Sequence, residues 1–482
     1  TSNPFNYLFP IPKEGLGLNP ILQDPALAIH PPILYLGYVG ASIIFSASLA
    51  AVAQNYISKE WAQHIKKWVL ISWIFLSLGI MLGSIWAYYE LGWGGFWFWD
   101  PVENVSLMPW LSLTALLHCI AVLERRATLT SWVVVLSITT FTLSMCGTFL
   151  VRSGLLNSVH TFANDPARGI FILIFLFVLI ILSLGVFFIF HKDNNGNQNN
   201  FFWLSRETSI LINNWFMMYF LSVVLIGTVY PIFLDVISSE KISVGPPFYH
   251  KLIAPFLIPF LLFMALGPRL KWIKSKIEKK YSIFIIFIIS IILTFFIIKN
   301  LTTNILFYTL LLSAAFFLFF TTLKELLTKK LNNSSQTIAH FGFSLLILSI
   351  LFNGILSSEV ITNMKIGEKF KFGKEEIFFK KIEERRESNF NSIVAFFEIK
   401  DLEGNVVELE PEIRVYNQPL MVTSEADIKT TLLEDKFIVM NLVKGNEYFN
   451  VRYQSKPFMV WIWISVFLLG LGGTIGLFKT RT

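Results

Sequence analysis

Long, uninterrupted runs of apolar residues are the main pattern along this chain. Each run is close to the roughly 20 helical residues that cross a hydrocarbon core of about 30 Å. Polar residues are concentrated in the connections between the runs. The pattern predicts an all-α polytopic membrane protein. The expected transmembrane helices, about eleven in number, cover residues 32–54, 68–88, 107–124, 130–150, 169–190, 209–233, 251–267, 281–299, 303–321, 337–357 and 457–478.

One long polar stretch, residues 358–456, separates the last apolar run from the others. It contains short alternating segments, such as residues 393–399, and turn signals such as Glu403-Gly404-Asn405. Alternation with a period of two residues is typical of β-strands. We therefore expect a transmembrane region at 1–357, a small β-rich domain outside the membrane at 358–456, and a last transmembrane helix with a short cytoplasmic tail at 457–482.

Lysine and arginine fall in alternate connections between the runs. Because basic loops favour the cytoplasmic side of a membrane, these connections are predicted to be cytoplasmic. The remaining connections, 1–31, 89–106, 151–168, 234–250 and 358–456, should face the outer side. A bacterial inner membrane, with these loops in the periplasm, is the favoured location, and a mitochondrial inner membrane is the alternative.

The composition agrees with a membrane protein and excludes other classes. Hydrophobic residues make up 54% of the 482 residues and charged residues 15%, which leaves too little polar surface for a soluble globule of this size. The net charge of +7 is spread over short loops, so no nucleic-acid partner is expected. Cys119 and Cys146 lie in apolar runs without a CxxC spacing, which argues against a disulfide framework or a thiol-redox site. Because the first residue is Thr and no signal peptide is evident, we expect an N-terminally incomplete chain.

The predicted outer connection at 89–106, the Trp-rich segment, combines aromatic rings, paired glycines and acids. Glycines allow close approach of the backbone to a ligand, and indole rings offer wide planar faces for stacking. An aromatic interfacial belt is the simpler interpretation, but a belt requires neither paired glycines nor acids at fixed offsets. The segment therefore predicts a site for a flat apolar ligand such as haem. Its candidate contacts are Trp93, Gly94, Gly95, Trp97, Trp99 and Asp100.

The Trp-rich segment resembles the tryptophan-rich WWD signature of the haem-handling superfamily that includes CcmF, NrfE and CcsA. Phe96 stands where the commonest CcmF form has Trp, and this change keeps an aromatic ring. The resemblance to the CcmF family in particular covers essentially the whole chain, apart from a missing N-terminal portion. It also rests on Leu22-Gln23-Asp24-Pro25, His30-Pro31-Pro32, Tyr35-Leu36-Gly37-Tyr38, Pro109-Trp110 and Thr148-Phe149-Leu150-Val151-Arg152-Ser153-Gly154.

Four histidines are candidate ligands of haem iron. His30 and His160 lie in predicted outer connections, and two neutral imidazoles on opposite sides of one iron would complete a haem site. His118 and His340 lie within apolar runs, where an imidazole is costly unless it has a partner. A hydrogen bond across helices would satisfy that need equally well. The resemblance implies that His30 and His160 ligate a transferable haem, and that His118 and His340 ligate a stable transmembrane haem b.

Several other polar residues have competing interpretations. Asp100 and Glu103 could transfer protons, but an acid beside Pro101 more often caps a helix. Arg152 could pair with a haem propionate or with a phospholipid headgroup. No role is predicted for His64, His191 and His250.

The resemblance implies a subunit of the cytochrome c haem lyase of system I maturation. Such a subunit binds haem at the outer membrane face and promotes its thioether attachment to the CxxCH motif of apocytochrome c. The expected partners are a CcmE-type haem chaperone, a CcmH-type subunit, apocytochrome c and membrane lipid. The outer domain 358–456 could be a docking surface for them. Two alternatives stay open: a haem transporter or exporter, although no P-loop is present, and a quinol-linked b-type electron carrier.

Overall fold

The computed structural model describes residues 5–7, 9–13, 15, 17–153, 166–192, 202–238, 242–275, 280–301, 304–328, 334–443, 445 and 447–478. The chain divides into two compact units. The helical unit comprises His30–Leu82, Trp97–Ile355 and Trp461–Thr482. The sandwich unit comprises Thr1–Ile29, Gly83–Phe96 and Leu356–Val460.

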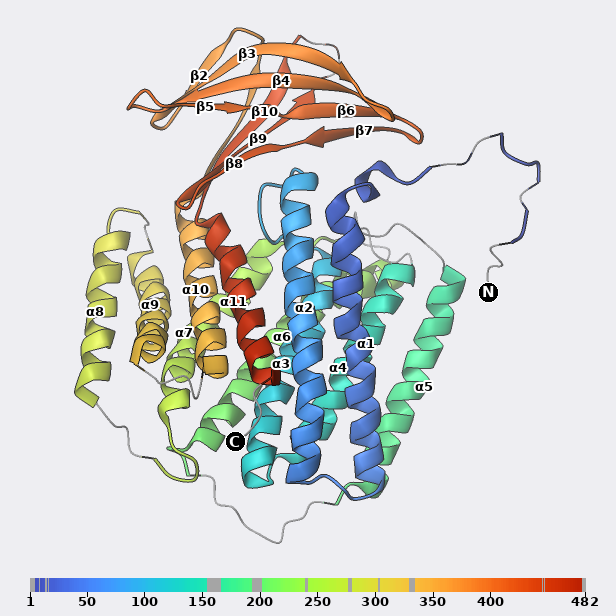
Figure 1. Ribbon diagram of the computed structural model, residues 1–482, viewed down its shortest axis with the longest axis vertical. Coiled ribbons are helices and arrows are strands. Elements are labelled where there is room, and N and C mark those ends of the chain that lie inside the picture. The colour runs from blue at the N-terminus through green and yellow to red at the C-terminus, as the bar shows by residue number, and fades with distance from the viewer. Residues whose placement is uncertain are drawn as a thin grey trace. The chain divides into compact units, whose positions relative to one another are not determined.

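Among the described residues, eleven helices are long and apolar enough to cross a membrane, and Figure 1 shows their order along the chain. The predicted fold class, a polytopic helical protein with a β-rich domain before the last helix, is confirmed. The helices are α1 Pro25–Ala53, α2 Lys59–Glu90, α3 Pro101–Arg126, α4 Thr130–Ser153, α5 Pro166–Phe190, α6 Arg206–Ser238, α7 Pro246–Leu266, α8 Lys280–Ile298, α9 Ile305–Thr328, α10 Ser334–Leu356 and α11 Met459–Phe478. The described residues also include the short 3₁₀ helices η1 Pro20–Leu22 and η2 Gly267–Arg269.

Helix α1 begins at Pro25, well before the predicted residue 32. The carboxylate of Asp24 accepts the backbone N–H of Ala26 at 2.8 Å, and Pro25 at the first position already has a helical φ. The start of the helix is therefore set by capping chemistry, which lies outside the apolar run. As a result His30 lies inside α1, not in the connection before it.

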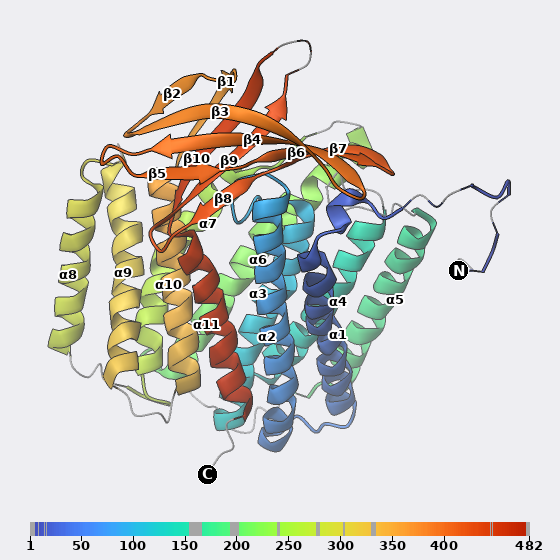
Figure 2. The ribbon, with the colours of Figure 1, turned by 45° about the horizontal axis from the view of Figure 1, so that its top comes forward.

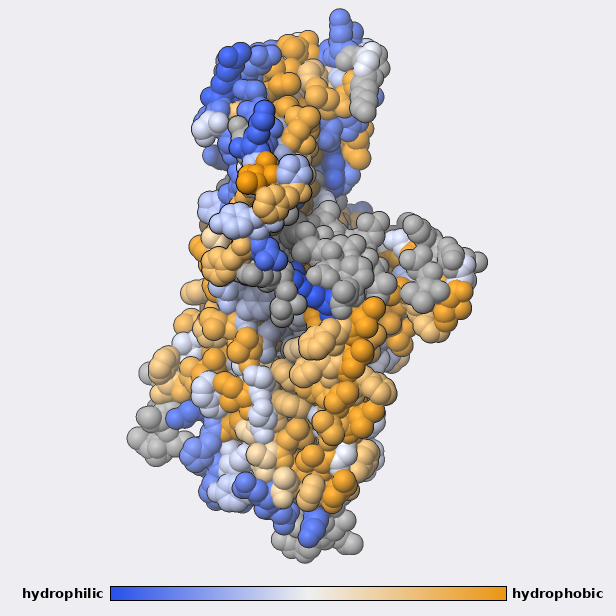
Figure 3. All heavy atoms as spheres, turned by 90° about the vertical axis from the view of Figure 1, so that its right-hand side faces the viewer, coloured by the Kyte–Doolittle hydropathy of each residue, from blue (hydrophilic) through white to orange (hydrophobic). Residues whose placement is uncertain are grey.

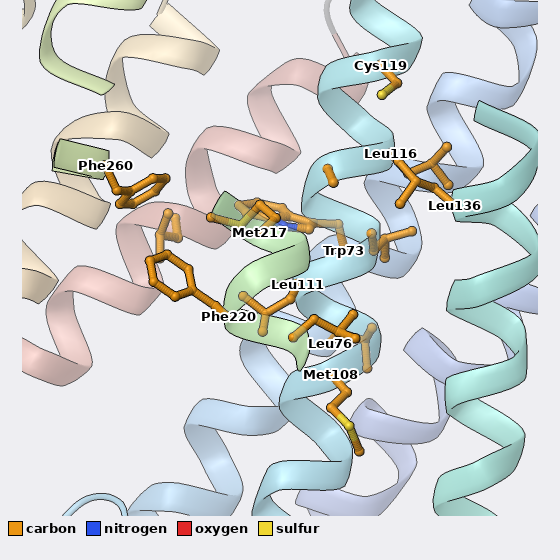
Figure 4. Close-up of a cluster of buried hydrophobic side chains, with 14 of the residues drawn as sticks. Trp73, Leu76, Met108, Leu111, Leu116, Cys119, Leu136, Met217, Phe220 and Phe260 are labelled. Carbon is orange, nitrogen blue, oxygen red and sulfur yellow. The ribbon is translucent and has the colours of Figure 1, made fainter. Parts of the chain in front are cut away.

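Helix α3 is central to the core of the helical unit, where it packs against α4 and α6. Its buried residues Leu116 and Cys119 belong to the same cluster as Trp73 of α2 and Met217 of α6 (Figure 4). At the contact between α10 and α11, Cβ atoms on Gly342 or Gly472 would meet backbone atoms of the facing helix. Small residues allow such close backbone approach inside membranes, and here they bring α10 directly against α11.

Helices α5 and α8 carry large apolar side chains on exposed faces. Phe177 and Phe188 of α5 and Phe284 and Phe296 of α8 are exposed. Figure 3 shows apolar side chains covering much of the face that includes α5. Figure 2 shows α8 beside α9 at one edge of the helical unit, and the two helices are in contact. Apolar faces of this extent suit hydrocarbon and not water.

The sandwich unit contains two antiparallel sheets. One has the strand order β1-β10-β9-β8, and the other has β2-β3-β4-β6-β7 with β5 paired to β4. Phe379, Phe397, Met440 and Tyr453 lie in the core of the unit. The strands are β1 Ser358–Met364, β2 Lys369–Phe372, β3 Glu375–Arg386, β4 Phe390–Lys400, β5 Val406–Leu409, β6 Glu412–Asn417, β7 Leu420–Glu425, β8 Asp427–Thr430, β9 Glu434–Leu442 and β10 Phe449–Pro457.

Asp435 of β9 is a buried acid in the sandwich unit. The residue is only 1% exposed, and its carboxylate accepts the hydroxyl of Tyr88 at 3.1 Å. Its second oxygen, Oδ1, has no hydrogen-bond partner among the described residues. Burial raises the pKa of Asp435 to about 6. Because this folded-state pKa exceeds that of the unfolded chain, protonation favours the folded state, and that benefit is lost as the pH rises from about 4 through 6.

We expect Asp435→Asn to raise the unfolding temperature of the full-length protein at pH 7.5 by roughly 2 °C or more. The gain should disappear near pH 4.5, where the wild-type acid is protonated. Thermal unfolding in detergent, followed by intrinsic fluorescence across this pH range, measures the difference. Asp401→Asn is the control, because the side-chain hydrogen bond from Asn405 lowers the pKa of Asp401 and should give the reverse trend. If Asp435→Asn changes the unfolding temperature by the same amount at every pH, the raised pKa of Asp435 is contradicted.

Candidate functional site

The imidazoles of His118 on α3 and His340 on α10 lie next to each other inside the helical unit. Their ring centroids are 6.4 Å apart and their planes are inclined by 35°. Two imidazoles that share one metal ion through bonds of about 2 Å have ring centroids roughly 6 Å apart. The pair therefore fits two axial ligands of a single haem iron.

Hydrogen bonding orients His118 for such a role. Its Nδ1 is 2.8 Å from the carbonyl oxygen of Thr114, one turn earlier in α3. A proton on Nδ1 places the lone pair on Nε2, which is the arrangement found in many metal-bound histidines. The hydroxyl of Thr114 in turn accepts the indole N–H of Trp73 on α2 at 2.9 Å, so a second helix supports this turn of α3.

Ion pairs join the helices at the end of the unit nearest to His118. This residue lies eight positions before Arg126, the last residue of α3, or about 12 Å along the helix. Arg126 pairs with Glu207 of α6 at 3.0 Å, and Glu207 is buried. Lys66 of α2 pairs with Glu124 of α3, also at 3.0 Å. These pairs link α2, α3 and α6 at the predicted cytoplasmic ends.

The second half of the Trp-rich segment belongs to the helical unit. The rings of Trp97 and Trp99 meet edge to face with centroids 6.1 Å apart. Trp99 stacks on Tyr249 of α7 at 4.2 Å and 6°, and its indole N–H points to Nε2 of His250 at 3.4 Å. One face of Trp99 is thus covered by protein. The buried indole N–H of Trp97 has no hydrogen-bond partner among the described residues, which makes it a candidate donor to a ligand.

Asn104 and a capping box fix the path of the backbone here. The side-chain amide of the fully buried Asn104 lies 3.1 Å from the carbonyl of Trp99 and 3.0 Å from the hydroxyl of Tyr249. Asp100 accepts the N–H of Val102, and Glu103 accepts the N–H groups of Phe98 and Asp100. These contacts form a complete capping box at the start of α3. The capping interpretation of Asp100 and Glu103 is confirmed.

The first half of the Trp-rich segment belongs to the sandwich unit. The guanidinium of Arg452 on β10 donates to the carbonyl of Trp93 at 2.5 Å and to that of Gly92 at 3.4 Å. Gly94 is buried with a φ of +71°, and a Cβ atom there would overlap the side-chain amide of Gln454. Close approach of protein to Gly94 is therefore one reason for a glycine at this position. Gly95 follows in the same bend and is partly exposed.

Of the two histidines predicted to ligate haem on the outer side, the structure describes His30 but not His160. His30 is half-buried in α1, and its Nδ1 is 2.8 Å from the carbonyl of Gly79 on α2. This is the same ring nitrogen and the same kind of acceptor as in His118. His160 lies outside the described residues, so its distance from His30 and from the Trp-rich segment stays a prediction. The ligand roles of all four histidines also stay predictions.

Comparisons with known proteins identify the family. The family model described as Cytochrome C assembly protein matches residues 2–156, and the CcmF C-terminal beta-sandwich model matches residues 355–457. The chain is 38% identical over 492 residues to the Cytochrome c-type biogenesis protein CcmF of Escherichia coli strain K12, a match that covers 100% of this chain and 76% of that protein. The chain belongs to the CcmF family.

A further relative and a solved structure are also similar. The Cytochrome c-type biogenesis protein NrfE of Haemophilus influenzae is 35% identical over 489 residues, covering 100% of this chain and 77% of that protein. The solved structure of a protein named Cytochrome c Heme Lyase CcmF superposes with a TM-score of 0.76 at 25% identity. It covers 95% of this chain and 73% of the other. The likeness therefore extends over helices and strands alike.

Sequence reasoning missed several residues of this CcmF family member that contact the Trp-rich segment. Tyr249 and His250 lie in the predicted outer connection 234–250, and His250 was given no role. Arg452 and Gln454 lie far along the chain in the predicted outer domain. Their spacing of two residues places both on one face of β10. No local pattern indicates what that face contacts.

Asn104→Ala should destabilise the helical unit, because it leaves the carbonyl of Trp99 and the hydroxyl of Tyr249 without their buried partner. The expected loss is roughly 1–3 kcal/mol, seen as a lower unfolding temperature in detergent. Asn363→Ala is the matched control, since its side chain accepts a bond from Asn450 at an exposed position. If both substitutions lower the unfolding temperature equally, the buried hydrogen bonds of Asn104 contribute no more to stability than an exposed one.

Proposed function

We propose that this protein is the haem-presenting subunit of a cytochrome c haem lyase, with a stable haem b in the helical unit and a transferable haem at the Trp-rich segment. The observation that carries the proposal is the neighbouring pair of His118 and His340, whose ring spacing of 6.4 Å suits one shared iron. It is supported by the family and by the similar solved structure named Cytochrome c Heme Lyase CcmF.

The stable haem b would be held by His118 and His340. When bound, it would supply one-electron redox chemistry. The residues of this chain contribute the two imidazoles, the Thr114 carbonyl that fixes the tautomer of His118, and an apolar setting inside the helices. Ligation accounts for two imidazoles next to each other within apolar helices, where such groups are otherwise expensive.

The transferable haem is the substrate, and His30 and His160 are its proposed axial ligands. Each thiol of the CxxCH motif adds across a haem vinyl group: the sulfur forms a bond to one vinyl carbon, and a proton adds to the other. No net oxidation or reduction occurs in this addition. The chain contributes position, since a haem edge held in place makes the attack effectively unimolecular. Trp97 and Trp99 would contact the transferable haem through their aromatic rings. The Nε1–H of Trp97 would donate a hydrogen bond to a haem propionate.

The partners and location follow from the family role. Haem would come from a CcmE-type chaperone, and a CcmH-type subunit would help to present reduced apocytochrome c. The sandwich, whose strands run from Ser358 to Pro457, is the proposed docking surface. The protein is a multi-pass membrane protein with eleven candidate spans in its described residues. We place it in a bacterial inner membrane with the Trp-rich segment in the periplasm.

The alternatives explain less of the structure. A haem exporter would be expected to have discontinuous helices around a midplane site, whereas each of the eleven described spans is a single helix. An electron carrier would need only His118 and His340. It would leave the capped, hydrogen-bonded Trp-rich segment without a role.

Replacing either histidine of the pair tests the stable haem. We expect the purified wild-type protein to contain haem b by the pyridine haemochrome assay, and His118→Ala and His340→Ala each to lose it. His64→Ala is the matched control, because the Nδ1 of His64 also lies against the carbonyl one turn earlier, at 2.7 Å, but on an exposed surface. A haem spectrum that survives both substitutions would mean that the pair serves only packing.

Replacing His30 or His160 tests the transferable haem separately. Both variants should retain the haem held by His118 and His340, because their own imidazoles are not its ligands. They should lose at least about 90% of holocytochrome c formation, because one axial bond is absent. Haem staining of cytochrome c in cells that depend on this protein measures the yield. Full yield from either variant would remove that histidine from the proposed ligand set.

A further inference from the structure

Two side chains of the strand β10 contact the first half of the Trp-rich segment. Arg452 donates to two successive carbonyl oxygens, those of Gly92 and Trp93. These carbonyls lie between two residues of positive φ, Gly92 at +61° and Gly94 at +71°. Backbone of this kind forms no regular hydrogen bonds of its own, so an outside donor can determine its path.

A guanidinium suits this task better than an ammonium. Its planar fork can reach two acceptors at once, whereas a lysine offers a single point charge. The carboxylate of Glu359 on β1 forms an ion pair with this guanidinium, with Oε1 at 3.3 Å from Nε of Arg452. Glu359 is paired directly with Gln454 in the sheet register. Its Oε2 accepts the side-chain N–H of Gln454 at 2.6 Å.

Gln454 is the second side chain of β10 that packs against this part of the Trp-rich segment. It is 0% exposed, and its amide fills the space that a Cβ on Gly94 would need. Arg452 and Gln454 are two residues apart in β10, so both side chains project from the same face of the sheet. One face of β1 and β10 thus carries a guanidinium for the carbonyls and an amide for the glycine.

We infer that Arg452 and Gln454 are positioning residues for haem binding, because they hold residues 92–94 of the Trp-rich segment in the conformation that the ligand requires. The inference rests on the proposed function. It gives two side chains of β10 an effect on haem binding that acts through the conformation of residues 92–94. It also assigns Gly94 to close packing against Gln454, not to close approach of haem.

The first test is a haem titration of the full-length protein in detergent. Ferric haem b is added to protein that already contains its stable haem, and the Soret band follows uptake at the second site. Arg452→Ala should weaken uptake roughly tenfold or more, and Arg452→Lys should lie between it and the wild type. The spectrum of the haem held by His118 and His340 should be unchanged, which excludes general unfolding.

Arg385→Ala is the control for the titration. Arg385 also lies in the sandwich unit, where it pairs with Glu410 at an exposed position. Its loss should change uptake by less than about twofold. Wild-type affinity in Arg452→Ala would overturn the inference. Failure of the wild type to take up a second haem would instead count against the proposed function.

The second test is a rescue experiment at Gly94. Gly94→Ala should abolish uptake of the second haem, because its Cβ displaces Gln454 and its φ of +71° is strained for alanine. Adding Gln454→Ala removes the overlap and should restore at least part of the uptake, with the backbone strain remaining. If the glycine is needed for the ligand, the double variant will be as defective as Gly94→Ala, and the assignment of Gly94 is then wrong.

Discussion

Polar groups inside a hydrocarbon layer must find their partners within the protein, and this constraint shapes the whole molecule. Backbone that crosses the layer is helical, so the irregular Trp-rich segment lies between spans. Its backbone is bonded by its own polar side chains, such as Glu103, and by others, such as Arg452. The ring of His118 uses a carbonyl of its own helix. The charged side chains at the helix ends pair with one another, as Arg126 does with Glu207. Polar side chains are therefore confined to the few positions where the fold supplies a hydrogen-bond or ion-pair partner.

The neighbouring imidazoles depend on close helix packing. His340 lies on α10, which approaches α11 so closely that a Cβ on Gly342 or Gly472 would meet backbone atoms of the other helix. His118 lies on α3, the most enclosed helix of the core. Each imidazole is thus carried by a helix whose rotation is restricted by its neighbours. A metal bound between them would meet ligands that are already oriented, which limits the reorganisation that binding requires.

Most of the fold could be predicted from the sequence, and much of the site geometry could not. Apolar runs indicated the eleven candidate spans found among the described residues, because hydrocarbon imposes their length. The ends were less accurate, since polar residues such as Asp24 extend α1 beyond the apolar run and bring His30 into the helix. The Trp-rich segment was evident from its residues. Its contacts with His250 and Arg452 were not, because they join positions 151 and 359 residues apart that no local pattern connects.

Three main-chain carbonyl groups of the Trp-rich segment accept hydrogen bonds from side chains. Arg452 binds the carbonyl of Trp93, Ser84 binds that of Phe96, and Asn104 binds that of Trp99. Contacts of this kind do not depend on which side chain the residue carries. A different side chain at position 96, for example, would leave the carbonyl that Ser84 binds in place. The hydrogen bonds that set the course of the segment are thus separate from the aromatic side chains that it carries.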